Sequence, residues 1–430
     1  MDDMFVRPKK KVPVEVLTQH HVNTGQPAVN PNDPEFLPPE EVAKQEQIIE
    51  TREKSSQKPP KPPKKASWWR RASIKKRLAV IIPVVILILG GGAAAYILTK
   101  KKPAKPVSAA TSSEAPKKEE PAKPTTVASA LTGLQVEPSL NDRGVTGIMI
   151  ENSVDARPQS GLLEAGVVYE AIAEGGITRF LTLYQESKPT YIGPVRSARP
   201  YYIDWLLPYG ATYAHVGGSS EALQMIKDFG IKDMNEFAYG SAFERVSSRY
   251  APHNVYTNMA NLDAIRAKNN WGNPKFSGFT RKTDAPSKVQ TATAIDVRIS
   301  SVLFNSHYDY DSGTNSYLRS EGGQAHKDEK SGKQLTPKVV VVIVVPYSIH
   351  PDGVHSKYQT VGSGRAFVFQ DGIVQETTWS KASQQAVLEL KDAGGRTLAL
   401  NAGQTWITAV GEASMVTYTG PPAPATGASQ

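Results

Sequence analysis

The sequence contains no cysteine among its 430 residues. This absence excludes disulfide bonds, thiol nucleophiles, iron–sulfur clusters and zinc sites with cysteine ligands. It also excludes an amino-terminal cysteine that could carry a lipid anchor. The globular part must therefore be stabilised by its packed core, and a segment of roughly 300 residues is large enough for that.

A positively charged folded region is also lacking, although the formal net charge of the chain is +9. The excess of lysine and arginine lies before residue 131, and basic and acidic residues nearly balance from Leu131 onward. A nucleic-acid-binding domain would concentrate its positive charge on the folded part. We therefore predict that nucleic acid is not a partner.

Long apolar runs are scarce, and the one that stands out is LAVIIPVVILILGGGAAAYIL at residues 78–98. A helix of about 20 residues spans the roughly 30 Å of a bilayer core. The run starts too far along the chain to be the apolar region of a cleaved signal peptide. We therefore predict a single-pass protein of the cell membrane, attached through residues 78–98. Basic residues before the run outnumber those after it, which favours a cytoplasmic amino terminus and an extracytoplasmic carboxyl-terminal part.

Low-complexity segments surround the predicted span. Residues 1–77 are expected to be a disordered cytoplasmic tail, whose Lys-Pro-Pro repeats either bind a cytoplasmic partner or serve as a spacer. Residues 99–132 are expected to be a flexible linker, and residues 419–430 a second disordered tail. The globular part should lie between these last two segments.

The first globular segment, residues 133–285, is predicted to be a mixed α+β domain. Strands are expected at VTGIMIEN, VVYEAIA and ITRFLTLY, the last two joined in a hairpin by a Gly-Gly turn, and at GATYAHV. Helices are expected at residues 198–207, 220–228 and 258–270. Alternation along VVYEAIAE places Glu170 and Glu174 on the same strand face.

The second segment, residues 286–418, is predicted to be mostly β. The run VVVVIVV suggests a strand buried on both faces, and Asp371-Gly372 is a strong hairpin signal. TLAL and QTWITAV are expected to complete a meander. The predicted fold class is therefore α+β, with a mixed α+β domain followed by a mostly β domain and preceded by a single transmembrane helix.

Charged side chains are unusually dense between residues 157 and 199. They are Arg157, Glu164, Glu170, Glu174, Arg179, Arg196 and Arg199. Arg196 and Arg199 would share a helix face, and their planar guanidinium groups suit a carboxylate or a phosphate. The arginines therefore either bind an anionic ligand or pair with Glu170 and Glu174 inside the protein, and the sequence leaves both alternatives open.

Two further polar segments are candidates for the same site. His215 ends a predicted strand before a glycine turn, and Ser219 or Ser220 then either helps to bind an anion or caps the following helix. His253 and Asn254 either line the site or tie two loops together. A Gly-x-Ser-x-Gly nucleophile elbow is absent from the sequence.

Aromatic residues follow the basic pair at Tyr201, Tyr202, Trp205, Tyr209 and Tyr213. Exposed rings would stack on sugars, whereas buried rings would fill a core. His350, Asp352 and His355 lack the spacing of known metal sites. We predict neither a metal site nor a cofactor.

Several strings resemble the YerB-like family of bacterial extracytoplasmic proteins. The first half matches through IENSVDARPQSGLLEAGVVYEAIAEGGITRFLTLY, YIGPVRSARPYYIDW, AHVGGSSEAL and APHNVYTN, and the second through VGSGRAFVFQDGIVQETTW and LNAGQTWI. The resemblance covers roughly residues 133–412. It implies two adjacent domains on the outer face of a membrane but no reaction. Members are commonly lipoproteins, whereas this chain lacks the cysteine that would carry the lipid.

We therefore expect a membrane-anchored extracytoplasmic binding or regulatory module of the cell envelope. Its ligand would be peptidoglycan, another envelope glycan or an anionic group. The predicted ligand-binding residues are Arg157, Glu170, Glu174, Arg179, Arg196, Arg199, His215, Ser219, His253 and Asn254. The alternative is a hydrolase of envelope glycan or peptide, and the sequence shows no catalytic signature that would decide between the two.

Overall fold

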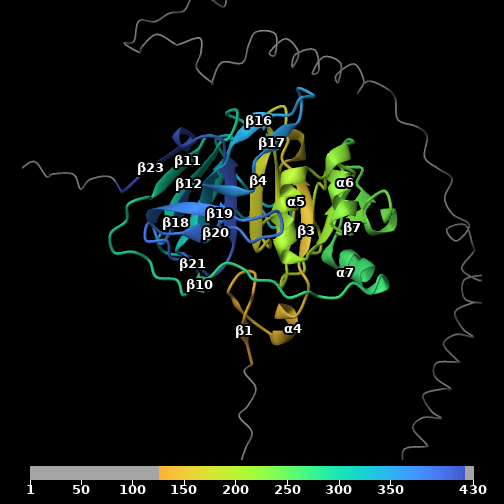
Figure 1. Ribbon diagram of the computed structural model, residues 1–430, viewed down its shortest axis with the longest axis horizontal. Coiled ribbons are helices and arrows are strands. Elements are labelled where there is room, and N and C mark those ends of the chain that lie inside the picture. Colours follow the sequence, from red (N-terminus) through yellow and green to blue (C-terminus); the bar gives the residue numbers. More distant parts are fainter. Residues whose placement is uncertain (1–124, 422–430) are drawn as a thin grey trace, which may run out of the picture. The chain divides into compact units, whose positions relative to one another are not determined.

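The computed structural model describes residues 125–421 (Figure 1). The predicted cytoplasmic tail and the predicted transmembrane helix at residues 78–98 lie outside the described residues. Within residues 125–421, no helix has both the length and the apolar character needed to cross a membrane. The last residues of the predicted linker join the fold, because Leu131 is buried in the core.

A ten-stranded sheet, in the order β20-β19-β18-β15-β22-β4-β5-β3-β6-β7, runs through the described part. In chain order its strands are β3 (Thr146–Glu151), β4 (Val167–Glu174), β5 (Ile177–Tyr184), β6 (Thr212–His215), β7 (Lys232–Asn235), β15 (Val339–Val344), β18 (Gly362–Gln370), β19 (Ile373–Lys381), β20 (Glu389–Lys391) and β22 (Thr405–Val410). Strand β22 lies between β15 and β4 and is parallel to both. The sheet thus takes strands from both sides of the predicted domain boundary at residues 285 and 286.

A five-stranded sheet has the order β14-β13-β12-β11-β23. Its strands are β11 (Ala294–Val297), β12 (Ser306–Asp311), β13 (Ser316–Glu321), β14 (Gln324–Ala325) and β23 (Val416–Thr419). Short pairs are β1 (Val127–Ala128) with β2 (Gln135–Val136), β8 (Glu244–Arg245) with β9 (Val255–Tyr256), β10 (Arg281–Lys282) with β21 (Leu400–Asn401), and β16 (Tyr347–Ile349) with β17 (Ser356–Tyr358).

Helices cover both faces of the ten-stranded sheet. Helices α5 (Pro200–Leu206) and α6 (Ser220–Asp228) pack against one face, and Figure 1 shows α5 in front of β3 and β4. Helix α7 (Met259–Lys268) and the five-stranded sheet share the core on the other face. The short helix α4 (Pro138–Asn141) contains no buried residue. The described part is therefore a strand-rich α+β fold.

Local sequence signals account for most of these elements. The bounds of α6 agree with the predicted helix, and Ser219 caps it by accepting a hydrogen bond from the Ala222 amide at 3.3 Å. The hairpins β4–β5 and β18–β19 turn at Gly175-Gly176 and Asp371-Gly372, all with positive φ. These signals are local, so the sequence alone reveals them.

Two predictions about the strands are wrong. The run QTWITAV forms β22, which is inserted between β15 and β4 instead of completing a meander, because its alternating apolar residues are buried on both faces of the large sheet. Glu170 and Glu174 do not share a face, because a β-bulge between Ile172 and Glu174 breaks the two-residue alternation. Glu170 contacts Arg319 of β13, whereas Glu174 contacts Arg199 beside α5.

Candidate functional site

Strand direction brings several predicted site residues to one edge of the large sheet. Strands β3, β4, β6 and β7 run parallel to one another, because β3 and β4 are both antiparallel to β5 and β6 is parallel to β3 and β7. Their last residues, among them Glu151, Glu174 and His215, therefore meet at the same edge. Open sheets containing parallel strands often bind ligands at this carboxyl edge. Arg179, near the start of β5, reaches the same edge from the opposite direction.

Two arginines hold Glu174 at this edge. Arg179 forms an ion pair with Glu174 Oε1, and Arg199 Nη2 lies 2.5 Å from Glu174 Oε2. Both arginines are buried, and each also donates to a backbone carbonyl, Arg179 to Ser197 and Arg199 to Ala198. Burial alone would raise the pKa of Glu174, but the two guanidinium groups outweigh it and hold that pKa below its ordinary value.

Arg196 forms the outer part of the same group. Its Nε lies 3.2 Å from Glu151 Oε1, and its side chain is 21% exposed. Within residues 125–421, no protein atom pairs with its two terminal nitrogens. We call Glu151, Glu174, Arg179, Arg196 and Arg199 the edge cluster. It sets three guanidinium groups against two carboxylates and so carries an excess of positive charge.

His253 lies beside the edge cluster. Its Nδ1 is 2.9 Å from Glu151 Oε1 and 3.2 Å from Ser153 Oγ, while Ser153 Oγ donates to the same carboxylate oxygen at 2.9 Å. A serine–histidine relay needs the serine and the carboxylate on different ring nitrogens. Here Ser153 and Glu151 both lie on Nδ1, and the carboxylate oxygen on the Nε2 side, Asp155 Oδ2, is 3.8 Å away, which is beyond hydrogen-bond distance. The arrangement therefore does not match a catalytic triad.

Glu170 occupies a separate group inside the molecule. Arg319 Nη2 lies 3.0 Å from Glu170 Oε2, and Trp406 Nε1 donates to the same oxygen at 2.8 Å. Arg319 also pairs with Glu321, which accepts a hydrogen bond from Asn152 and forms an ion pair with Arg157. We call Arg157, Glu170, Arg319, Glu321 and His326 the buried network.

Burial shifts the pKa values of two members of the buried network. It raises the pKa of Glu170, and the positive charge of Arg319 only partly opposes that shift. Burial lowers the pKa of His326 well below its ordinary value, and Arg319 and Arg157 lower it further. A neutral His326 leaves two arginines facing two glutamates. The network is therefore balanced, and Glu170, with no exposed surface, does not line the surface to which Arg196 belongs.

The remaining predicted residues have structural partners. His215 is buried, with Nδ1 2.7 Å from the Gly217 carbonyl and Nε2 2.9 Å from Asp233 Oδ1. Asn254 donates to the Val246 carbonyl at 3.4 Å and ties the loop between β8 and β9. The structure therefore brings five predicted residues together, namely Glu174, Arg179, Arg196, Arg199 and His253. The other predicted residues contact partners elsewhere in the fold.

The aromatic residues after Arg199 form part of the core. Tyr201, Tyr202, Trp205, Tyr209 and Tyr213 are each at most 5% exposed. The hydroxyl of Tyr202 donates to the carbonyls of Ala171 and Arg179. The buried alternative is the one the structure shows, so these rings are not available to stack on sugars.

Sequence reasoning missed Glu151, Ser153 and the partners of Glu170. Glu151 ends an apolar strand, and a carboxylate at the end of such a strand was a usable signal for the carboxyl edge. Arg319 and Glu321 lie about 150 positions from Glu170 in a polar string, SYLRSE. Nothing local indicates that these two charges face inward.

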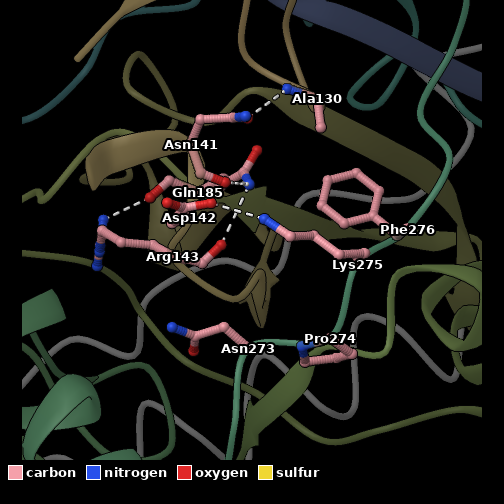
Figure 2. A pocket seen from close by; sticks show the side chains of 9 residues that line it. All are labelled: Ala130, Asn141, Asp142, Arg143, Gln185, Asn273, Pro274, Lys275 and Phe276. Atoms are coloured by element: carbon pink, nitrogen blue, oxygen red, sulfur yellow. Dashed lines mark hydrogen bonds and ion pairs between the residues drawn. The ribbon is translucent and has the colours of Figure 1, made fainter. Parts of the chain in front are cut away.

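Two hollows lie away from the edge cluster. One, of about 30 Å³, has room for little more than a water molecule, and Figure 2 shows Lys275, Asp142 and Gln185 among the side chains around it. Lys275 Nζ donates to Asp142 Oδ1 at 2.6 Å there. The other, of about 340 Å³, lies beside Lys381 at the ends of β18 and β19. Neither is lined by a predicted site residue.

Comparisons with known proteins place most of the described residues in one family. Residues 131–272 match the amino-terminal domain of a protein of unknown function, DUF3048, and residues 295–407 match its carboxyl-terminal domain. The chain is 29% identical over 286 residues to a Bacillus subtilis (strain 168) protein named "Putative lipoprotein YerB", covering 65% of this chain and 85% of that protein. The crystal structure of YerB from Bacillus subtilis is similar with a TM-score of 0.62 and 27% identity, covering 68% of this chain and 99% of that one. Because both domain matches occur in order and the fold is shared, the chain belongs to the YerB-like (DUF3048) family, whose function is unknown.

Proposed function

We propose that this chain is a membrane-anchored extracytoplasmic binding or regulatory module of the bacterial cell envelope. Its edge cluster recognises an anionic ligand, such as a carboxylate of a wall glycan or its peptide. The apolar run at residues 78–98 supports the anchor. The name of the Bacillus subtilis relative, a lipoprotein, supports the same side of the membrane.

The observation that carries the proposal is the state of Arg196. Its terminal nitrogens have no protein partner within residues 125–421, while the neighbouring Arg179 and Arg199 are held by Glu174. A planar guanidinium group with two free nitrogens can grip a carboxylate or phosphate through two parallel hydrogen bonds. The excess positive charge of the edge cluster favours such an anion.

Calorimetric titration of the full-length chain with peptidoglycan fragments tests this proposal. We expect Arg196→Gln to weaken binding at least tenfold and Arg196→Lys to weaken it less, since lysine keeps the charge but loses the planar fork. Lys275→Gln removes an exposed cation far from the edge cluster and is the matched control. Unchanged binding by a folded Arg196→Gln variant would show that the edge cluster is not the site.

The same incubation separates binding from hydrolysis of envelope glycan or peptide. A binding module leaves the fragments intact, whereas a hydrolase produces new reducing ends or amines. The lowered pKa of Glu174 supports binding, because a general acid needs a raised pKa. Product formation that requires Glu174 or His253 would favour the hydrolase.

Protease treatment of intact spheroplasts tests the location. We expect the part from residue 125 to 421 to be digested while the amino-terminal 77 residues stay protected. The opposite pattern would contradict both the orientation and the envelope assignment.

A further inference from the structure

Exposed apolar side chains are unevenly distributed over the described part. Apart from Leu134 and Val289, the large hydrophobic residues that are exposed lie in connections between strands of the two large sheets, with Tyr347 and Ile349 in the short strand β16. We call six of them the apolar rim: Val154, Phe237, Tyr250, Leu303, Ile349 and Val354. Phe237 is 74% exposed and Tyr250 85% exposed. Gathered apolar exposure of this kind marks interaction surfaces more often than scattered single residues do.

Backbone contacts connect part of the apolar rim to the edge cluster. The Gly175 amide, next to Glu174, donates to the Val354 carbonyl at 3.4 Å. Phe237 covers Gly217, whose carbonyl accepts from the Ala198 amide beside Arg199. Ile349 is the last residue of β16 and Val354 lies between β16 and β17, and Figure 1 shows these two strands beyond the end of β4.

The loop after β3 extends the same surface. Val154 follows Ser153, which donates to Glu151 of the edge cluster. Arg249, next to Tyr250, donates to the Asp155 carbonyl at 2.8 Å. Arg157 donates to the Leu303 carbonyl at 2.8 Å. These contacts place Val154, Tyr250 and Leu303 beside the loop that follows Glu151 of the edge cluster.

We propose that the apolar rim and the edge cluster together form a docking surface for a partner protein that presents a carboxylate within an apolar segment. The inference rests on the proposed function, because Arg196 receives the anion. The rim is mainly aliphatic, and aliphatic side chains pack on apolar protein groups, whereas sugars prefer aromatic faces. Arg196, the group that receives the anion, is only 21% exposed, so a carboxylate that reaches it has to project from a chain, as an Asp or Glu side chain or a carboxyl terminus can.

A display library of random octapeptides, screened against the full-length chain, tests the inference. One format leaves the carboxyl terminus free and the other embeds the octapeptide internally, so the two distinguish a terminal from a side-chain carboxylate. We expect enriched peptides to place a carboxylate beside leucine, isoleucine, valine or phenylalanine. Synthetic copies should bind at least tenfold more tightly than their amidated or Asn and Gln counterparts.

Two multiple variants serve as a matched pair. The rim variant combines Phe237→Ser, Ile349→Ser and Val354→Ser. The control combines Leu134→Ser with Val289→Ser, which removes side chains outside the rim that are 45% and 73% exposed. We expect the rim variant to weaken peptide binding at least fivefold and the control to leave it unchanged. Circular dichroism checks that both variants stay folded.

Several outcomes would overturn the docking surface. They are a lack of enrichment in both formats, enriched peptides without apolar residues, a rim variant that binds like the control, and rim-dependent binding to phosphatidylglycerol vesicles in place of peptides. If Arg196→Gln abolishes binding of wall fragments while the rim variant binds peptides normally, the proposed function stands and the docking surface falls. If neither probe depends on Arg196, both proposals fall.

Discussion

Glu170 and Glu174 lie four positions apart on β4, yet the protein surrounds them differently. Glu170 is enclosed in the buried network, where two arginines balance two glutamates and His326 is neutral. Glu174 belongs to the edge cluster, where three guanidinium groups face two carboxylates and Arg196 keeps free nitrogens. Similar residue types thus form a closed structural group on one face of the sheet and an open group at its edge.

The difference shows which property of a charged cluster points to a ligand. Arginine and glutamate occur in both groups, so residue type does not distinguish them. Charge balance and solvent access distinguish the two groups. A buried ion pair whose charges are balanced cannot bind a ligand, whereas an accessible edge with excess charge can. The following changes test whether the two groups differ in this way.

The largest effect is expected from Arg319→Met. The change leaves Glu170 and Glu321 buried without their shared cation, and breaking a buried pair by removing one partner costs about 3–5 kcal/mol. Urea unfolding at pH 7 measures the loss. Adding Glu170→Gln should recover part of it, since one uncompensated charge is then gone. A loss below 1 kcal/mol would show that the network is not closed.

Acid should weaken the buried network through His326. Its pKa is depressed in the folded state, so the unfolded chain takes up a proton at higher pH than the folded one does. Stability is therefore present above about pH 6.5 and is lost as the pH falls below it, by at most about 1.4 kcal/mol per pH unit. Urea unfolding between pH 7 and pH 5 should show a smaller slope for His326→Gln. Equal slopes would contradict a neutral, buried histidine.

Phosphate should distinguish Glu174→Gln from Glu170→Gln. Removing the Glu174 charge frees two arginines at an open edge, and an anion from solution can replace it. A ligand at ten times its dissociation constant stabilises the folded state by about 1.4 kcal/mol. Thermal unfolding in phosphate and in chloride of equal ionic strength measures this rescue. Phosphate should not stabilise Glu170→Gln, because residue 170 is enclosed in the protein. Equal stabilisation of both variants by phosphate would contradict the difference between the edge cluster and the buried network.

The smallest effect on stability is expected from Arg196→Gln. Arg196 is 21% exposed in its ion pair with Glu151, and His253 Nδ1 stays 2.9 Å from the same carboxylate, so we expect a loss of at most about 1 kcal/mol. Urea unfolding should therefore detect little change in a variant that no longer binds anions. A loss as large as that of Arg319→Met would mean that Arg196 holds the fold together.

Hairpin turns and helix caps could largely be predicted from the sequence. The glycine turn of β4–β5, the Asp-Gly turn of β18–β19 and the capped helix α6 all depend on residues close together in the chain. The charged segment between residues 157 and 199 contains Glu174, Arg179 and Arg199, which form ion pairs with one another in the structure. Which of its side chains bind a ligand stays a prediction.

Long-range pairing could not be predicted. The bulge after Ile172 shifts Glu174 to the other face, and a single extra residue in a strand leaves no mark in the alternation of VVYEAIAE. The pairing of Glu170 with Arg319 depends on how two distant segments pack. The position of β22 next to β4 likewise depends on residues about 240 positions apart.

This position of β22 has a consequence for biosynthesis. Strand β4 leaves the ribosome early, but its permanent neighbour on one side is made more than two hundred residues later. Until then, the backbone groups of β4 on the side that β22 later occupies are unpaired, and strands of other nascent chains can pair with them. We therefore expect maturation to be slow and to benefit from chaperones, and a chain cut shortly before Thr405 to aggregate instead of leaving a soluble amino-terminal half.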